Sequence, residues 1–169
     1  WSAVRAAELA VSSASDIQSA MDEAQPGDVL TMADGTWNQQ TIYFSGNGLP
    51  GKPITLRAKT PGKVILTGTS TLWATGEHLV IDGLQFIDGG LDDATLDDLK
   101  DTIEGPRSVV TLGPGSHIRL TNCVMDGYNP SDGTLEYRWV RLDGTNHEVD
   151  HCTFTGKTNR KPVLNLFRP

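Results

Sequence analysis

The hydrophobic and polar positions of the 169-residue chain follow two different periods. Near the N-terminus, apolar side chains recur at helical spacing around Ser15-Asp16-Ile17-Gln18, which has the S-x-x-Q form of a capping box. This pattern predicts a helix over residues 15–25, and Pro26-Gly27 ends it. After the helix, short apolar runs are separated by Gly, Asn, Asp and Pro, which is typical of β-strands.

The β-rich runs are four or five residues long and continue to the end of the sequence. Those that stand out are VLTM (29–32), TIYF (41–44), ITLR (54–57), VILT (64–67), HLVI (78–81), SVVTL (108–112), HIRL (117–120), WVRL (139–142) and PVLNL (162–166). Apart from a possible turn in an acidic stretch, no second helical pattern appears. The sequence therefore predicts an all-β fold with one helix at its start.

The β-rich part repeats itself in two columns. Residues 81–86 align with residues 120–125 and 149–154, each with an aliphatic residue, an apolar one three later, and Phe or Met two after that. In the second column, Val110-Thr111-Leu112 matches Val140-Arg141-Leu142 and Leu164-Asn165-Leu166. Repeats of this length without helices favour a solenoid in which stacked coils share one core.

The repeats predict a right-handed parallel β-helix. The helix at 15–25 is expected to cover the open edge of the first coil, because an uncovered edge would pair with other chains. We expect a leader segment at 1–14 and β-helix coils over 15–169. Because the last apolar run has no cap, we expect the solenoid to be incomplete at its C-terminal end and to continue beyond residue 169.

The two cysteines fall in the same column of successive repeats. Cys123 and Cys152 are too few for a disulfide framework and have no C-x-x-C spacing. Stacked small core residues are favoured, and a disulfide between neighbouring coils is the alternative.

Charge divides the chain into two unequal parts. The net charge is −7, but residues 138–169 hold six basic and three acidic residues. The stretch 88–104 holds seven acidic residues against one lysine, which favours a solvated surface insertion. A calcium loop is the alternative, although the spacing of an EF-hand loop is missing.

The composition also limits location and partners. No apolar run approaches the roughly 18 residues of a membrane span, so no membrane is expected as a partner. A nucleic acid is not expected as a partner either. The chain begins with Trp1 and shows no signal-peptide pattern, as a processed N-terminus would. We expect a secreted or periplasmic protein.

Three segments resemble the opening coils of polysaccharide lyase family 6, which contains alginate lyases and chondroitinase B. They are residues 27–37, 46–86 and 139–159, and the most specific stretch is P-I-T-L-R-A-x-T-P-G-K-V at 53–64. The resemblance runs from about Ala14 to the last residue.

The resemblance implies a calcium-assisted β-elimination on a uronate-containing polysaccharide, with alginate as the expected substrate. Calcium would neutralise the uronate carboxylate, a lysine would remove the C5 proton, and an arginine would assist at the leaving oxygen. No E-x-E followed by a lysine occurs in the sequence. The catalytic residues and calcium ligands are therefore expected beyond residue 169, and the isolated chain is expected to be inactive.

The basic C-terminal part is expected to contact the anionic polysaccharide. The predicted substrate-binding residues are Lys157, Asn159, Arg160 and Arg168. A polar loop without binding function is the alternative for the first three. Arg138 and Arg141 are expected on a solvated outer face, and Tyr128 and Trp139 in buried packing rather than against sugar rings.

Other functions and partners remain open at this stage. A lyase of dermatan sulfate or chondroitin and a non-catalytic carbohydrate-binding β-helix module are the alternatives. Besides the anionic polysaccharide, the expected partner is the C-terminal remainder of the same β-helix or a complementary chain.

Overall fold

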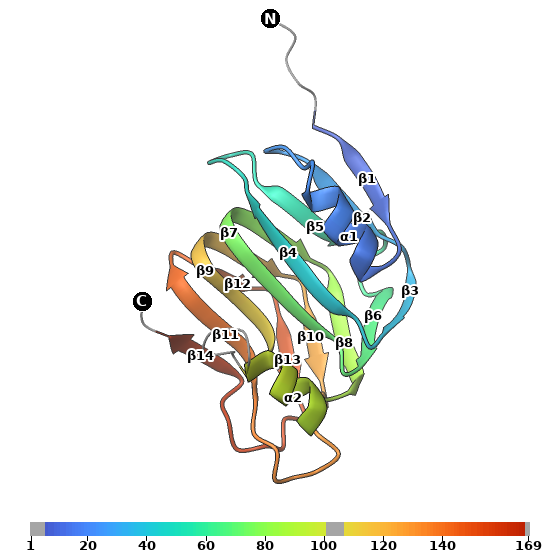
Figure 1. Ribbon diagram of the computed structural model, residues 1–169, viewed down its shortest axis with the longest axis vertical. Coiled ribbons are helices and arrows are strands. Elements are labelled where there is room, and N and C mark those ends of the chain that lie inside the picture. Colours follow the sequence, from blue (N-terminus) through green and yellow to red (C-terminus); the bar gives the residue numbers. More distant parts are fainter. Residues whose placement is uncertain (1–5, 101–106, 168–169) are drawn as a thin grey trace, which may run out of the picture.

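The protein is a parallel β-helix whose strands form three faces. The computed structural model describes residues 6–100 and 107–167 (Figure 1). Face A consists of β4 (Thr41–Asn47), the first half of β7 (Thr71–Asp82), the first half of β9 (Ser108–Thr121), β11 (Arg138–Thr145) and β14 (Leu164–Phe167). Face B consists of β1 (Glu8–Val11), β2 (Val29–Met32), β5 (Ile54–Ala58), the second halves of β7 and β9, and β12 (Glu148–Asp150). Face C consists of β3 (Gly35–Asn38), β6 (Val64–Gly68), β8 (Leu84–Gly89), β10 (Val124–Asp126) and β13 (Thr153–Thr155).

Every pairing between these strands is parallel, and each joins neighbouring coils. The predicted parallel β-helix is confirmed. The repeat alignment is confirmed residue by residue, since Ile81 pairs with Leu120 and Leu120 with Val149. In the second column, Val140 pairs with both Val110 and Leu164.

The core is built from like positions stacked at the rung spacing of about 4.8 Å. On face B the buried column runs Leu30, Leu56, Ile81, Leu120. On face C it runs Trp37, Leu66, Phe86, Met125. Because each coil contributes one residue to each column, no single coil could bury these side chains by itself.

Several short strands were missed in the sequence. The nine predicted runs lie within observed strands or overlap them, but β1, β3, β8, β10, β12 and β13 were not predicted as strands. Three of the six have only three residues, too few to show an alternating pattern. Tertiary pairing with neighbouring coils, rather than local propensity, makes them strands.

Glycines line the corner where β7 and β9 bend from face A to face B. Gly46, Gly76, Gly115 and Gly144 pair in register across four coils. A Cβ atom on Gly76 would lie 2.0 Å from the Gly46 carbonyl oxygen. The backbones meet so closely at this corner that only glycine fits.

Helix α1 (Ala14–Met21) packs against β4 with Ile17 and Met21 buried, so the predicted capping helix is present, although it ends at Met21 rather than at residue 25. Its N-cap is Ser13, whose Oγ accepts a hydrogen bond from the Asp16 amide at 3.1 Å, rather than Ser15. Strand β1 precedes the helix and pairs with β2, so the segment expected to be a leader contains a strand of the first coil.

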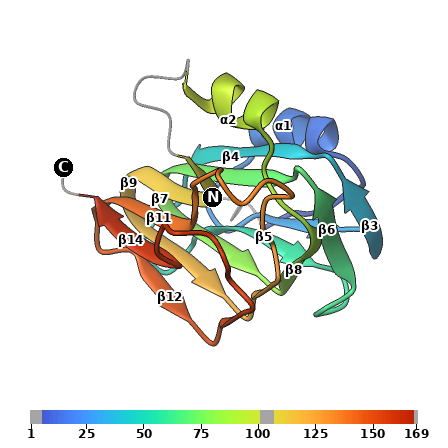
Figure 2. The same cartoon turned by 90° about the horizontal axis from the view of Figure 1, so that it is seen from below.

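The acidic insertion forms a second helix, α2 (Asp93–Lys100), between β8 and β9. Leu91 and Leu96 are buried, whereas the carboxylates of Asp92 and Asp93 are exposed. The described acidic residues of 92–98 are exposed, as expected for a solvated surface insertion, and the two leucines anchor it to the core. Figure 2 shows α1 and α2 on the side of β4. Neither described helix has the length and apolar character needed to cross a membrane.

Cys123 and Cys152 occupy the predicted shared column. The Thr153 amide donates to the Cys123 carbonyl oxygen at 2.9 Å, which fixes the two coils in register. Both cysteines are free. Their mutual hydrogen bond lowers the pKa of the half-buried Cys152 to about 7 and raises the pKa of the buried Cys123.

Candidate functional site

Three long connections lead from face C to face A, so their described parts lie along the same side of the solenoid. Those parts are residues 90–100 with α2, residues 127–137 and residues 156–163. Since the inward positions of face A are used by the core, the outward positions of face A and these connections form the surface on this side.

A buried aromatic cluster fixes the connection 127–137. The hydroxyl of Tyr137 and the indole N–H of Trp139 both donate to the Tyr128 carbonyl oxygen, at 3.0 and 2.8 Å. The Tyr128 hydroxyl donates to the carbonyl oxygens of Gly68 and Ser70. All three rings are buried, which confirms the prediction of buried packing for Tyr128 and Trp139.

Lys157 lies against this cluster. Its Nζ donates to the Tyr137 carbonyl oxygen at 3.3 Å and sits 5.6 Å from the centroid of the Trp139 ring. Burial lowers the pKa of Lys157 to about 8, because a charged amine loses hydration there. The amine therefore points to the protein interior rather than freely into solvent.

The other predicted binding residues lie on the same connection. Asn159 accepts a hydrogen bond from Lys157 through Oδ1, so the structure brings these two together. Arg160 is exposed, and the neighbouring Lys161 pairs with Glu136 at 3.0 Å. Arg168 lies outside the described residues. The binding role of these residues stays a prediction.

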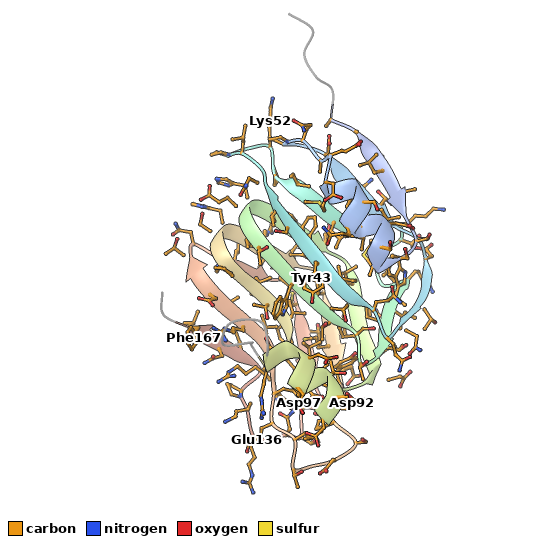
Figure 3. All side chains as sticks on the ribbon, viewed as in Figure 1. Tyr43, Lys52, Asp92, Asp97, Glu136 and Phe167 are labelled. Carbon is orange, nitrogen blue, oxygen red and sulfur yellow. The ribbon has the colours of Figure 1, made fainter. Side chains whose placement is uncertain are left out.

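A line of outward side chains crosses face A from coil to coil. Tyr43, Trp73, Thr111, Arg141 and Asn165 pair in register on successive strands, and we call them the outer ladder. Figure 3 shows Tyr43 on β4, and Phe167, near the end of the ladder, on β14.

Arg141 is the charged member of the outer ladder, and it is only 7% exposed. The expectation of a solvated arginine is therefore wrong. Its Nη2 donates to Asp143 Oδ2 at 2.9 Å, and the Phe167 ring covers the guanidinium at 3.9 Å. β14 causes this burial, because Asn165 stacks directly beside Arg141. Arg138 is half-buried, and burial together with the charge of Arg141 lowers its pKa.

Sequence reasoning did not single out Tyr43, Trp73 or Asn165 as site residues. A usable signal was present, because Thr111, Arg141 and Asn165 are the middle residues of the aligned second column. In a strand with inward neighbours on both sides, the middle residue points outward.

The calcium ion implied by the resemblance would need a cluster of ligand side chains. Within residues 6–100 and 107–167, no group of three or more His, Cys, Asp or Glu side chains is placed to hold a metal ion.

A match to a known family model shows the family to which the chain belongs. The family model for Chondroitinase B matches residues 11–168, nearly the whole chain. The chain belongs to the chondroitinase B family. No curated protein matches this family member.

Solved structures place this chondroitinase B family member beside lyases of polysaccharide lyase family 6. The PL6 family alginate lyase AlyGC matches with 32% identity and a TM-score of 0.83 over 94% of the chain. The PL6 family lyase Pedsa3628 from Pseudopedobacter saltans matches with 33% identity and a TM-score of 0.80, also over 94%. A mannuronic acid specific family 6 lyase from human gut microbiota matches with 29% identity and a TM-score of 0.77 over 95%. The chain spans 21%, 34% and 36% of these three proteins, respectively.

Proposed function

We propose that this chain is part of a polysaccharide lyase that cleaves alginate by β-elimination. The observation that carries the proposal is the match to an alginate lyase at 32% identity over 94% of the chain. A secreted or periplasmic location is part of the proposal, because a polymeric substrate of this kind is met outside the cytoplasm.

Within the proposal, the described residues bind the polymer and do not break it. Arg160 offers an exposed positive charge to uronate carboxylates, and the Lys157–Asn159 pair lies on the same connection. The base and its partner arginine are proposed outside the 169 residues. Calcium is part of the proposal through the family resemblance, and its ligands are proposed with the base and the arginine, since the described residues contain no group of three or more His, Cys, Asp or Glu placed to hold a metal ion.

A lyase of dermatan sulfate or chondroitin is the second candidate, because the matching family model is that of Chondroitinase B. Alginate and dermatan sulfate carry a similar negative charge per sugar, so the net charge of the chain does not separate them. The match to an alginate lyase at 32% identity favours alginate.

The test compares the two polymers directly. The purified chain is run through gels containing alginate or dermatan sulfate, and its retardation is measured. We expect retardation by alginate and much less by dermatan sulfate. The reverse order would replace the substrate, and no retardation by either polymer would contradict the proposed function.

A second measurement addresses cleavage. The chain is incubated with alginate and calcium while the absorbance of unsaturated uronate products is followed. We expect no increase, and a clear increase would place the catalytic groups within the 169 residues. A non-catalytic carbohydrate-binding module would also bind the polymer without cleaving it. The same assay is therefore repeated with a longer form of the protein. A lyase should then release unsaturated products, whereas a binding module should not.

A further inference from the structure

Two cysteines lie next to each other on successive coils, at the corner between faces B and C. Cys123 directly precedes β10 and Cys152 directly precedes β13, and these two strands pair in parallel (Figure 1). The Thr153 amide donates to the Cys123 carbonyl oxygen at 2.9 Å, so the two cysteines stand one rung apart. Rungs are separated by about 4.8 Å, which lies within the roughly 4.4–6.8 Å range of Cα separations in disulfides.

The backbone turns both side chains in the same direction. The residues before the two cysteines have φ angles of +53° and +50°, so the chain bends in the same left-handed conformation at both corners. The Cys123 thiol donates to the Thr121 carbonyl oxygen at 3.2 Å, and the Cys152 thiol donates to the Leu120 carbonyl oxygen at 3.6 Å. Because these acceptors are consecutive residues, both sulfur atoms lie at one corner, where the two thiols also hydrogen-bond to each other.

The two thiols differ in their access to solvent and in their acidity. Cys123 is 2% exposed, whereas Cys152 is half-buried. The hydrogen bond from Cys123 lowers the pKa of Cys152 to about 7, and the same hydrogen bond together with burial raises the pKa of Cys123. A thiolate is the form that attacks a disulfide, so Cys152 is the thiol that reacts first and Cys123 is the thiol placed to follow.

We propose that Cys123 and Cys152 form a reversible disulfide that joins the two coils. The oxidant is a small disulfide, RSSR, such as oxidised glutathione. The Cys152 sulfur attacks one sulfur of RSSR, which breaks the S–S bond of the oxidant, forms a mixed disulfide and releases RSH. The Cys123 sulfur then attacks the Cys152 sulfur, which forms the bond between the two residues and releases the second RSH. Two thiols are oxidised and one RSSR is reduced, and the two thiol protons leave on the two RSH molecules.

The disulfide goes beyond the proposed function, because it does not involve the polysaccharide. It shares with that function only the secreted or periplasmic location, where disulfides form and persist. The bond would close the segment between residues 123 and 152, which contains β10, the connection 127–137, β11 and β12. A cross-link of this kind restricts the unfolded chain, so the oxidised protein is the more stable form.

The first test treats the folded, reduced chain with oxidised glutathione and weighs the product by mass spectrometry. We expect a monomer that is lighter by two hydrogen atoms. Digestion with trypsin in the absence of reductant should join the peptide 120–138 to the peptide 142–157, and dithiothreitol should separate them again. A chain that keeps both thiols, that retains glutathione, or that forms disulfide-linked dimers instead would overturn the proposal.

Two variants test the order of the reaction. Cys123→Ser should stop at the mixed disulfide, with one glutathione on Cys152, because the second thiol is missing. Cys152→Ser should stay unmodified, because Cys123 is buried. Equal uptake of glutathione by the two variants would contradict the assigned order. The wild-type result stands even where a variant does not fold.

A second measurement compares the melting temperatures of the oxidised and reduced wild type. We expect the oxidised form to melt about 5 °C or more above the reduced form. The matched control is Cys152→Ser taken through the same treatment, which should show no shift. An oxidised wild type that melts at or below the temperature of the reduced form would contradict a disulfide that fits this corner.

The outcomes are independent of those for the proposed function. Retardation by alginate is measured on the reduced chain and does not require the disulfide. A failure to form the disulfide therefore leaves the alginate proposal in place, and a failure to bind alginate leaves the disulfide in place.

Discussion

At the scale of single residues, direction and burial decide what a basic side chain can do. Lys157 and Arg141 both come from the basic C-terminal part, but neither points freely into solvent. Lys157 is held by the Tyr137 carbonyl oxygen and by Asn159. Arg141 is held by Asp143 and Phe167, so its unused Nε faces a fixed direction.

The buried amine of Lys157 predicts a pH-dependent stability. Its pKa falls from 10.5 to about 8 on folding, so the unfolded chain binds more protons between these values. Stability should therefore rise as pH increases through this window. Lys157→Met should remove this part of the rise, whereas Lys59→Met, at an exposed lysine, should keep it. Urea unfolding at several pH values between about 7 and 10.5 measures the difference, and parallel curves for wild type and Lys157→Met would contradict it.

At the scale of elements, the corner between faces A and B depends on stacked glycines. β7 and β9 pass through it as continuous strands. The sequence predicted β9 as two separate runs and only the second half of β7. The bend works because Gly76, Gly115 and Gly144 each leave room for the carbonyl oxygen of the glycine in the coil before it.

Gly76→Ala should destabilise the protein strongly. The new Cβ would meet the Gly46 carbonyl oxygen at 2.0 Å, and the φ of +113° is itself unfavourable for alanine. We expect a loss of about 3 kcal/mol or more in the free energy of unfolding, measured with urea. The control is Gly133→Ala, which has nothing within 4 Å and should change stability by less than about 0.5 kcal/mol. A neutral Gly76→Ala would show that the corner can relax.

At the scale of the whole molecule, β14 presents an apolar surface. Among the described residues, β14 pairs with β11 alone, and Leu166 is 74% exposed. A paired strand with a free edge and exposed apolar side chains favours association with another β-strand.

The isolated chain should therefore associate as its concentration rises. Leu166→Lys should reduce this association, because a charge on an edge strand opposes strand pairing. Leu49→Lys is the control, since Leu49 is 53% exposed but lies in the connection between β4 and β5. Sedimentation velocity over a range of concentrations measures the effect, and equal association of both variants would exclude β14 as the contact.

The sequence by itself determined the fold and its register. The two repeat columns predicted which residues stack, because a solenoid brings like positions of successive coils together. They also separated inward Val140 and Leu142 from outward Arg141, since side chains alternate along a strand. The capping helix followed from local spacing, although three nearby serines, Ser12, Ser13 and Ser15, hid which one forms the cap.

The tertiary structure alone decided how the candidate site is built. Residues 90–100, 127–137 and 156–163, which belong to these connections, show no repeat, so their course over face A depends on long-range contacts such as Tyr128 with Gly68. Those contacts bury Lys157 and hold it against Trp139. Sequence patterns report which side of a strand a residue takes, but not what lies over it, because burial depends on segments distant in the chain.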